Sequence, residues 1–434
     1  WENGVGLVQK TFAQIVTFTR TGSTATYFNS AGVLTTAAAD VPRFDYNPST
    51  LAPLGFLIEE ARTNSIRNNS MVGAVAGTPG TPPTNWDIVV SGTGITQQII
   101  GTGTEDGITY IDVKFSGTGS GTSVPQIRPE TTTQIVAASG QTWSSSYYLR
   151  IVGGSTTGCT GTFQQIWQER DAAGTTLTLA AVAIADPTTA ALRTQRSVLT
   201  RTLTDAGTAR LTNRVQWTFT NGVAVDITLR IGLPQLEQGA FATSVIPTVN
   251  AFALGVTRNA DVANINTLAP WYSQVSGTVY AEFMNMVAGS ATQTNTSQGV
   301  WSTTQSALGN FNGYAVSTNL TASNTATINF RARYAPTAKN DSINVGAASG
   351  FLGANTVYKT AAAWDSSQIT ADSDVGVLTT TTNNAAVDMG THNQMQLGAQ
   401  NAGGTSPYQL NGWLRRITYY PRRLSNTDLQ TITT

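Results

Sequence analysis

Residues 214–233 read RVQWTFTNGVAVDITLRIGL, and this stretch sets the pattern for most of the chain. Two runs rich in β-branched and aromatic residues, Arg214–Phe219 and Val223–Leu233, are separated by residues 220–222 (TNG). Short apolar runs divided by turn residues are typical of antiparallel strands, and no helical period is visible here. The stretch therefore predicts β structure.

The composition extends this prediction to the whole chain. Charged residues make up only 11% of the 434 residues, and Thr, Ser, Asn, Gln, Gly and Ala take their place. Several of these residues favour turns, and Thr favours strands because its branched Cβ fits a pleated surface. We therefore expect an all-β protein, and the length predicts two or three domains.

Strand-like runs separated by turn residues fall into two blocks, and each block predicts an antiparallel β-sandwich. The first is residues 85–250, expected to be a jelly roll, and the second is residues 265–434. Residues 71–84 are rich in Gly and Pro and indicate a linker or long loop after a first block, residues 1–70. The clearest strand-like runs are residues 86–90, 110–115, 142–151, 163–168, 192–203, 214–219, 223–233, 277–286, 299–301, 314–318, 326–333, 356–364, 394–397 and 412–420.

Three short stretches carry local predictions. Residues 11–19 alternate well enough for a strand. The glycine-containing triplets 101–103 and 117–119 lack the strand-to-helix context of a phosphate loop, so hairpin turns are expected there. Near the end of the chain, Ser425 is placed to cap a helical turn, and Asp428 lies in its first turn, where the helix dipole favours negative charge.

Residue counts narrow the function. The chain carries 24 basic and 24 acidic residues without a basic stripe, so nucleic acid is not expected as a partner. No apolar run reaches the length of a membrane helix, so no membrane insertion is expected. Zinc sites and Ser-His-Asp triads usually need histidine or cysteine, and the chain has one of each, Cys159 and His392. We therefore expect no enzyme and no cofactor, with His392 a solvated loop residue.

Charged residues in the second half of the chain are expected to be structural. Arg258 and Asp261 are predicted to hold a domain junction together. Asp365, Asp372 and Asp374 lie close together in sequence, and Ca²⁺ needs several oxygen ligands. Their spacing is not that of an EF-hand and no Glu follows, so solvated loop carboxylates are the preferred interpretation and no metal is expected.

The adjacent acids Glu59 and Glu60 are also interpreted as structural. Neighbouring residues of a strand point to opposite faces, so these two carboxylates cannot jointly flank one glycosidic bond. We expect one of them instead to pair with Arg62 or Arg43 and to fix a turn.

Aromatic residues are the candidates for sugar binding, because a ring can stack on a sugar while polar groups contact its hydroxyls. Trp86, Trp271 and Trp301 flank turn-like stretches, and Tyr314 follows a predicted turn at residues 310–313. These four are the candidate carbohydrate contacts, with burial in a core or an interface as the alternative for each. The tryptophans within strand patterns are expected in the cores: Trp143, Trp167, Trp217, Trp364 and Trp413.

Three parts of the chain resemble known modules. Residues 55–64 (GFLIEEARTN), with shorter motifs from Phe18 onward, look like an N-terminal segment shared by tailed-bacteriophage tail fibres, head spikes and related adhesins. Residues 235–248 (QLEQGAFATSVIPT), followed by residues 257–261 (TRNAD), resemble the end of the jelly-roll module in the same proteins. Residues 410–425 (LNGWLRRITYYPRRLS) are similar to the last strands of concanavalin A-like (laminin G-like) lectin domains. Residues 358–366 (YKTAAAWDS) fit an inner strand of that fold.

The resemblance implies an architecture and a location. Residues 1–70 would form a virion-attachment or oligomerisation segment with Glu59, Glu60, Arg62 and Asn64 as its motif residues, and residues 265–434 a lectin-type sandwich. It also implies a place on the virion surface, other virion proteins as partners, a homotrimer or another symmetric oligomer, and binding to cell-surface polysaccharide.

The leading hypothesis is a tail fibre or head spike that attaches a phage or phage-like particle to host carbohydrate. One alternative is a purely structural head-fibre, decoration or baseplate protein without a ligand. Another is a capsule-degrading glycan hydrolase, which two carboxylates about 5 to 10 Å apart in an open groove would favour.

Overall fold

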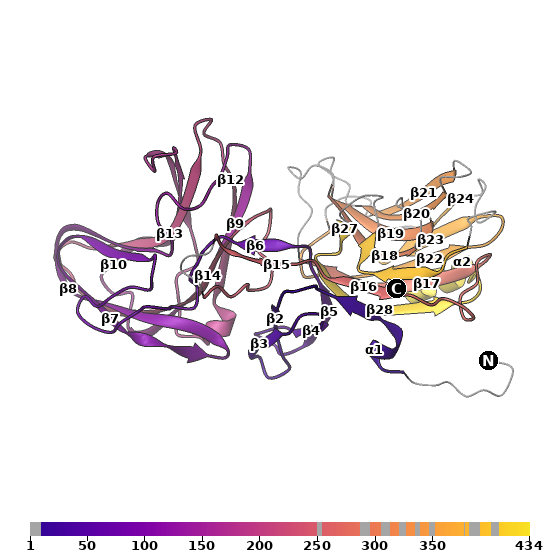
Figure 1. Cartoon of the computed structure of the whole chain (residues 1–434), viewed down its shortest axis with the longest axis horizontal. Coiled ribbons are helices and arrows are strands. Elements are labelled where there is room, and N and C mark those ends of the chain that lie inside the picture. The colour runs from indigo at the N-terminus through magenta and orange to yellow at the C-terminus, as the bar shows by residue number, and fades with distance from the viewer. Residues whose placement is uncertain are drawn as a thin grey trace.

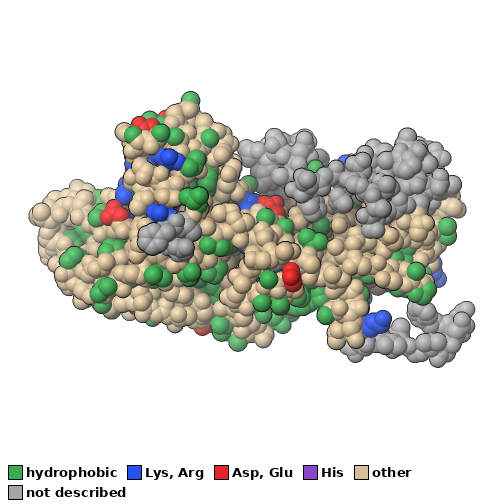
Figure 2. Space-filling model, viewed as in Figure 1, with side chains coloured by type: hydrophobic (Ala, Val, Ile, Leu, Met, Phe, Trp, Pro, Cys, Tyr) green, Lys and Arg blue, Asp and Glu red, His purple; other side chains and the backbone are tan. Residues whose placement is uncertain are grey.

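The computed structural model describes residues 10–249, 254–286, 296–304, 313–320, 327–334, 339–346, 352–376, 378–381, 391–400 and 408–434. Strands dominate these residues, and the helices among them are short, so the prediction of an all-β fold is confirmed. The chain forms two lobes that meet at a narrow junction (Figure 1). The surface of the face in Figure 2 is largely uncharged, as the composition indicates.

One antiparallel sheet makes up the N-terminal lobe, in the order β11-β10-β13-β8-β14-β9-β12 with β7 paired to β8. The long strands shift register at several points and curve around a shared apolar core (Figure 1). This lobe therefore has the β-sandwich character expected for the first block. Its strands are β7 (Asp87–Glu105), β8 (Ile108–Arg128), β9 (Thr142–Gly154), β10 (Cys159–Arg170), β11 (Thr176–Ala183), β12 (Arg196–Thr202), β13 (Arg210–Phe219) and β14 (Ala224–Gln238), with the short 3-10 helix η1 (Leu192–Thr194) before β12.

Two seven-stranded antiparallel sheets make up the C-terminal lobe. One sheet has the order β1 (Thr17–Thr19), β16 (Val262–Ile265), β25 (Gln394–Leu397), β18 (Thr296–Thr304), β19 (Gly313–Leu320), β20 (Thr327–Tyr334) and β21 (Lys339–Gly346). The other has the order β24 (Thr379–Thr381), β23 (Ile369–Ser373), β22 (Val357–Trp364), β17 (Gly277–Asn285), β28 (Gly412–Tyr420), β5 (Pro53–Ile58) and β4 (Arg43–Tyr46). The short strands β26 (Ala399–Gln400) and β27 (Tyr408–Gln409) pair beside them.

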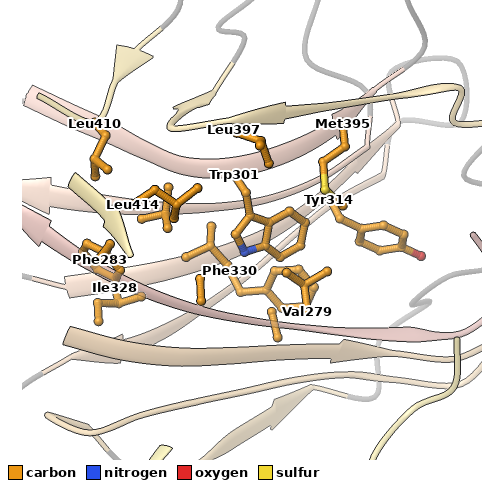
Figure 3. Packing of buried hydrophobic residues seen from close by; sticks show 14 of the residues in the cluster. Val279, Phe283, Trp301, Tyr314, Ile328, Phe330, Met395, Leu397, Leu410 and Leu414 are labelled. Atoms are coloured by element: carbon orange, nitrogen blue, oxygen red, sulfur yellow. The ribbon is translucent and has the colours of Figure 1, made fainter. Parts of the chain in front are cut away.

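Apolar side chains from the two sheets fill the space between them (Figure 3). Trp301 of β18 and Phe330 of β20 come from one sheet, while Val279 and Phe283 of β17 and Leu414 of β28 come from the other. Alternate residues of β17 face this core because side chains alternate along a strand. The two faces together form the second predicted sandwich.

Helix α2 (Asn426–Thr433) covers the back of the second sheet, where Leu429 packs against Tyr280 and Ala361. The predicted cap is confirmed, because the hydroxyl of Ser425 accepts a hydrogen bond from the Asp428 backbone N–H at 3.1 Å. Neither α2 nor any other helix within the described ranges is long and apolar enough to cross a bilayer.

Residues 10–70 do not form a separate unit: strands from residues 17–58 join the C-terminal lobe, while Ile66 packs with Trp143 and Leu236 of the N-terminal lobe. Strand β1 pairs with β16, and β5 pairs with β28, so this segment supplies strands to both sheets of the sandwich. The sandwich is therefore larger than the predicted block of residues 265–434. Sequence spacing could not reveal these pairings because they join residues hundreds of positions apart. A role of the segment in virion attachment remains a prediction.

The remaining strands of this segment lie at the junction of the lobes. Strands β2 (Ala25–Phe28) and β3 (Leu34–Ala37) form a hairpin beside it, and β6 (Arg62–Asn64) pairs with β15 (Val256–Arg258) across it (Figure 1). The two lobes are thus joined by chain segments from both ends of the first sandwich.

Two local predictions are wrong. Residues 11–19 do not form one strand, because Thr11 caps the short helix α1 (Phe12–Ile15) and only β1 follows. The triplets 101–103 and 117–119 lie inside β7 and β8, where glycines accommodate irregular register, and the chain reverses instead between Glu105 and Ile108.

Candidate functional site

A cleft of about 730 Å³ lies where the two lobes and the β2–β3 hairpin meet. Its walls include β2, β4, β12, the segment after β14, and β28, which come from both lobes. Aromatic residues are prominent among its lining residues: Tyr27, Phe28, Tyr46, Tyr148, Phe241 and Trp413. Tyr27, Tyr46 and Phe241 line the cleft and are half-buried as residues.

Asp45 places a carboxylate in the cleft wall. Its two oxygens accept hydrogen bonds from the Phe28 backbone N–H at 2.8 Å and from Trp413 Nε1–H at 3.0 Å. Burial raises the pKa of Asp45 to about 6, and these two hydrogen bonds only partly oppose it. The carboxylate therefore links the β2–β3 hairpin to the C-terminal lobe, and it titrates near neutral pH.

Two arginines line the same cleft. Arg193 pairs with Asp106 at 2.8 Å and donates to the Pro48 carbonyl at 3.0 Å. Arg196 donates to the Ser146 hydroxyl and the Thr243 carbonyl, each at 2.9 Å. The cleft is thus lined by both guanidinium groups and aromatic rings.

A fully buried set of charges, the ionic junction, lies beside the cleft. It consists of Arg20, Arg43, Glu59, Arg258 and Asp261, each 0–1% exposed. Arg43 pairs with Glu59 at 2.8 Å and with Asp261 at 2.5 Å, and Arg20 pairs with Asp261 at 3.0 Å. Arg258 completes the set with a 3.5 Å contact to Glu59. The predicted junction role of Arg258 and Asp261 is confirmed, although they act through Glu59 and the two other arginines.

Electrostatics keep Glu59 ionised in this setting. Burial alone would raise the pKa of Glu59, but the charges of Arg258 and Arg43 and hydrogen bonds from Ser244 lower it to about 2. The Ser244 backbone N–H and hydroxyl donate to the carboxylate at 2.7 and 2.6 Å. Arg43 also donates to Ser244 and to the Thr26 carbonyl, and both of these residues line the cleft. The ionic junction therefore fixes part of the cleft wall.

The predicted pairing of the acid pair is confirmed in both of its versions. Glu59 pairs with Arg43, and Glu60 pairs with Arg62 at 2.5 Å. Asn64 is fully buried, and its side-chain oxygen Oδ1 accepts from the Leu236 backbone N–H at 3.1 Å. These contacts give residues 59–64 the structural role that the sequence predicted.

The first two recognised motifs also pack on each other. Arg62 donates to the Gln238 carbonyl and lies 4.7 Å from the ring centre of Phe241. A Cβ at Gly239 would overlap the Arg62 guanidinium, so a larger residue there would displace this side chain. Residues 55–64 and 235–248 thus form a single interlocked unit at the junction.

Three of the four candidate carbohydrate contacts are buried, so for these three the alternative of burial in a core is confirmed. Trp86 is 7% exposed and donates to the Asn68 carbonyl at 2.7 Å, while Trp301 and Tyr314 are 0% exposed in the C-terminal core. Tyr314 is the second residue of β19, as the predicted strand at 314–318 implies, and its ring stacks on Trp364 with centres 4.4 Å apart. Most of the turn predicted at residues 310–313 lies outside the described residues. Turn-like neighbours in sequence do not indicate exposure when the opposite sheet covers the ring.

Trp271 is the member of that set that keeps accessible surface, being half-buried. Its indole N–H donates to the Thr267 carbonyl at 3.1 Å, and its ring meets Tyr419 edge-on at 5.3 Å. Sugar binding by Trp271 remains a prediction. The five tryptophans predicted to lie in cores are all at most 7% exposed, which confirms that interpretation.

The carboxylates considered for calcium have separate partners. Asp365 pairs with Arg423 at 3.5 Å and caps the turn at Ser367, and Asp372 accepts a hydrogen bond from the Thr433 hydroxyl at 2.8 Å. Asp374 is exposed. Across the described ranges, no three acidic, histidine or cysteine side chains come together as metal ligands.

His392 is buried in the C-terminal lobe, so its interpretation as a solvated loop residue is wrong. It is 2% exposed, and its Nδ1 lies 3.1 Å from both the Tyr272 and the Thr303 hydroxyls. The polar neighbours in the sequence concealed the aromatic cluster that covers it.

Sequence reasoning missed the residues that line the cleft. Tyr27 and Tyr46 lie in short strands of the first block, and Phe241 follows β14. Their motifs were recognised, but only the fold brings the three rings to one cavity. An aromatic residue in each recognised motif was the signal that could have pointed to them.

No known family model matches the chain, and neither does any curated protein. Among solved structures, the carbohydrate-binding module CBM40 of the Ruminococcus gnavus IT-sialidase, bound to α2,3-sialyllactose, aligns with 37% of this chain and 84% of its own at 16% identity and a TM-score of 0.30. A mutant of the NanB sialidase from Streptococcus pneumoniae aligns with 38% of this chain at 16% identity and a TM-score of 0.30, and only 25% of that sialidase is covered. Domains LG4–5 of the mouse laminin α1 chain align with 85% of this chain and 92% of their own at 8% identity and a TM-score of 0.24. Likeness at these levels does not extend to a shared function.

Proposed function

We propose that this chain is a tail-fibre or head-spike protein on the surface of a phage or phage-like particle, and that its cleft binds host cell-surface carbohydrate. The observation that carries the binding proposal is the composition of the cleft wall. The half-buried residues Tyr27, Tyr46 and Phe241 border a hollow of about 730 Å³ that also presents two guanidinium groups. Ligand sites of about 300–1,000 Å³ commonly combine apolar rings with a few polar groups in this way.

The particle-surface part of the proposal is supported by the two phage-type motifs. Residues 55–64 and 235–248 resemble segments of tail fibres and head spikes, and their side chains interlock at the junction. Symmetric copies on a particle would convert weak contacts with a repeated polysaccharide into firm attachment.

Binding without catalysis is the proposed mode of action. Glycan hydrolysis commonly requires two carboxylates about 5 to 10 Å apart. Among the described residues that line the cleft, Asp45 is the only acid. Its side chain is engaged by Phe28 and Trp413, so it is better placed to shape the wall than to attack a substrate.

A purely structural protein is the second candidate. The ionic junction favours it, since its five buried charges pair with one another without a ligand and are tied to the end of the first sandwich through Ser244. Burial of Trp86, Trp301 and Tyr314 also removes three of the aromatic contacts expected of an adhesin.

An array of bacterial surface glycans probed with the full chain separates the two candidates. The binding proposal predicts selective retention of one or a few glycans, with about tenfold weaker binding, equal to about 1.4 kcal/mol, for Tyr46→Ala. Tyr408→Ala serves as the matched control, because Tyr408 is 43% exposed and does not line the cleft. A chain that binds no glycan on a broad array supports the structural candidate.

A further inference from the structure

A group of four arginines, the arginine face, lies on the N-terminal lobe away from the cleft. It consists of Arg128 at the end of β8, Arg170 at the end of β10, and Arg210 and Arg214 of β13. In these strands Ile127, Val215 and Trp217 point into the core. Because side chains alternate along strands, the four arginines project from the opposite side of the sheet.

Strand register sets like charges against each other in this group. Arg170 pairs directly with Arg210 across β10 and β13. Ile127 pairs with Val215, so Arg128 and Arg214, one step further along the same antiparallel register, also face each other. Like charges at facing positions destabilise a sheet, so the arrangement carries an electrostatic cost that the fold alone does not remove.

The available counter-charge is small. Asp87 pairs with Arg128 at 2.9 Å, and it is the only carboxylate within ion-pair distance of the four guanidinium groups among the described residues. The buried Nε atoms of Arg128 and Arg210 have no hydrogen-bond partner within that same part of the chain. Three arginines therefore lack an acidic partner.

Neutral groups hold two of the guanidinium groups side by side. The side-chain oxygen of Gln168 accepts from Arg170 at 2.7 Å and from Arg214 at 2.8 Å. Arg170 and Arg214 are only 7% and 8% exposed, so these charges are recessed and poorly screened by solvent. Burial, together with the charges of Arg128 and Arg170, lowers the pKa of Arg214 to about 10. One N–H of each guanidinium converges on this oxygen, while Arg170 also donates to the Thr212 hydroxyl and the Gly174 carbonyl, and Arg214 to Gln216. All of these acceptors are neutral, and a charged acceptor binds a guanidinium more strongly.

We propose that the arginine face binds an anionic group, a carboxylate, sulfate or phosphate, carried by an acidic polysaccharide. The anion would supply the missing negative charge between Arg170 and Arg214 and relieve the repulsion between facing arginines. The choice of a polysaccharide as the carrier of the anion rests on the proposed function. The anion site itself does not depend on that function. It lies outside the cleft, so one long acidic chain could be held at two places.

Calorimetric titration of the full chain with heparin, a sulfated polysaccharide, tests this site against neutral dextran. We expect heparin binding that weakens steeply with salt, and no dextran binding at the arginine face. Arg214→Gln should weaken heparin binding at least tenfold. Arg422→Gln is the matched control, because Arg422 is exposed on the C-terminal lobe and its loss changes the net charge equally.

Asp87→Asn keeps the test decisive if Arg214→Gln misfolds. It removes the single nearby carboxylate and should strengthen heparin binding several-fold. Equal weakening by Arg214→Gln and Arg422→Gln, or no heparin binding at low salt, overturns the site. Tighter binding of a double-stranded DNA of similar charge overturns the assignment to polysaccharide. Tyr46→Ala should leave heparin binding through this face intact, so failure of the cleft proposal and failure of this one are distinguishable.

Discussion

Asp45 makes the stability of the folded chain depend on pH. Burial raises its pKa from the ordinary 3.8 to about 6, so the folded chain holds the proton more tightly than the unfolded chain. The contribution of the Asp45 carboxyl to the free energy of unfolding is therefore fully present below about pH 4 and is lost as pH rises through 6. The shift corresponds to about 3 kcal/mol over that range.

Asp45→Asn tests this sign. The asparagine cannot ionise, so the loss of unfolding free energy between pH 4 and pH 7 should be smaller in the variant than in the parent chain by about 3 kcal/mol. Urea unfolding at several pH values measures it. Parallel pH profiles for the two proteins would show that the carboxyl does not titrate in this range.

Asp261 is the residue on which the ionic junction depends most. It pairs with two buried arginines and accepts the Glu59 backbone N–H at 2.9 Å. Removing one partner of a buried ion pair leaves uncompensated charge, so Asp261→Asn should lower the free energy of unfolding by about 3–5 kcal/mol. In Asp226→Asn, which alters an acid 61% exposed, the change should stay within about 0.5 kcal/mol. Similar small losses in both variants would contradict the role of the junction.

At the residue scale, the sequence predicted which charged side chains form ion pairs better than it predicted which aromatic side chains are exposed. The pairing of Glu59 and Glu60 with arginines followed from local spacing and charge. Exposure of Trp86, Trp301 and Tyr314 depended on strands that reach them from distant parts of the sequence. Flanking turn residues carry no information about those strands.

At the scale of elements, the long β7–β8 hairpin depends on glycines at its irregular positions. Gly94 has a φ of +87°, and a Cβ there would lie 2.1 Å from the Thr118 carbonyl oxygen. Gly121 has a similar φ of +79° but open space around it. The two positions therefore share the backbone cost of a left-handed conformation and differ in the clash.

Comparing alanine substitutions at Gly94 and Gly121 separates the free-energy cost of the clash from the cost of the left-handed backbone. Gly121→Ala should lower the free energy of unfolding by about 1–2 kcal/mol, the cost of a left-handed residue with a side chain. Gly94→Ala should cost about 1–3 kcal/mol more, because the facing backbone must move. Thermal and chemical unfolding measure both variants, and equal losses would mean that the hairpin relaxes freely around Gly94.

The same hairpin marks the limit of sequence prediction for elements. Most strands appeared in the expected places, because apolar alternation and turn residues report local structure directly. The glycine triplets were misread as turns because glycine serves bulges as well as turns. The strand content of residues 10–70 was recognisable, but its partners in β16 and β28 were not.

At the scale of the whole molecule, the junction of the two lobes creates the cleft that is the proposed binding site. Two sandwiches, the β2–β3 hairpin and two interlocked motifs create a cleft that no single domain contains. The sequence indicated two sandwiches and their motifs, but the cleft arises from their relative placement. The proposed carbohydrate binding in the cleft would therefore depend on the ionic junction as well as on the lining rings.

The central claim is that this cleft binds carbohydrate. The most direct test is the affinity of the array-selected glycan for the full chain, measured by calorimetry alongside Tyr46→Ala, Trp271→Ala and Arg214→Gln. We predict that Tyr46→Ala weakens binding of a neutral glycan about tenfold, while the other two variants retain the affinity of the parent chain. Unchanged affinity in Tyr46→Ala with a loss in Trp271→Ala would contradict the claim and place the site on the C-terminal lobe.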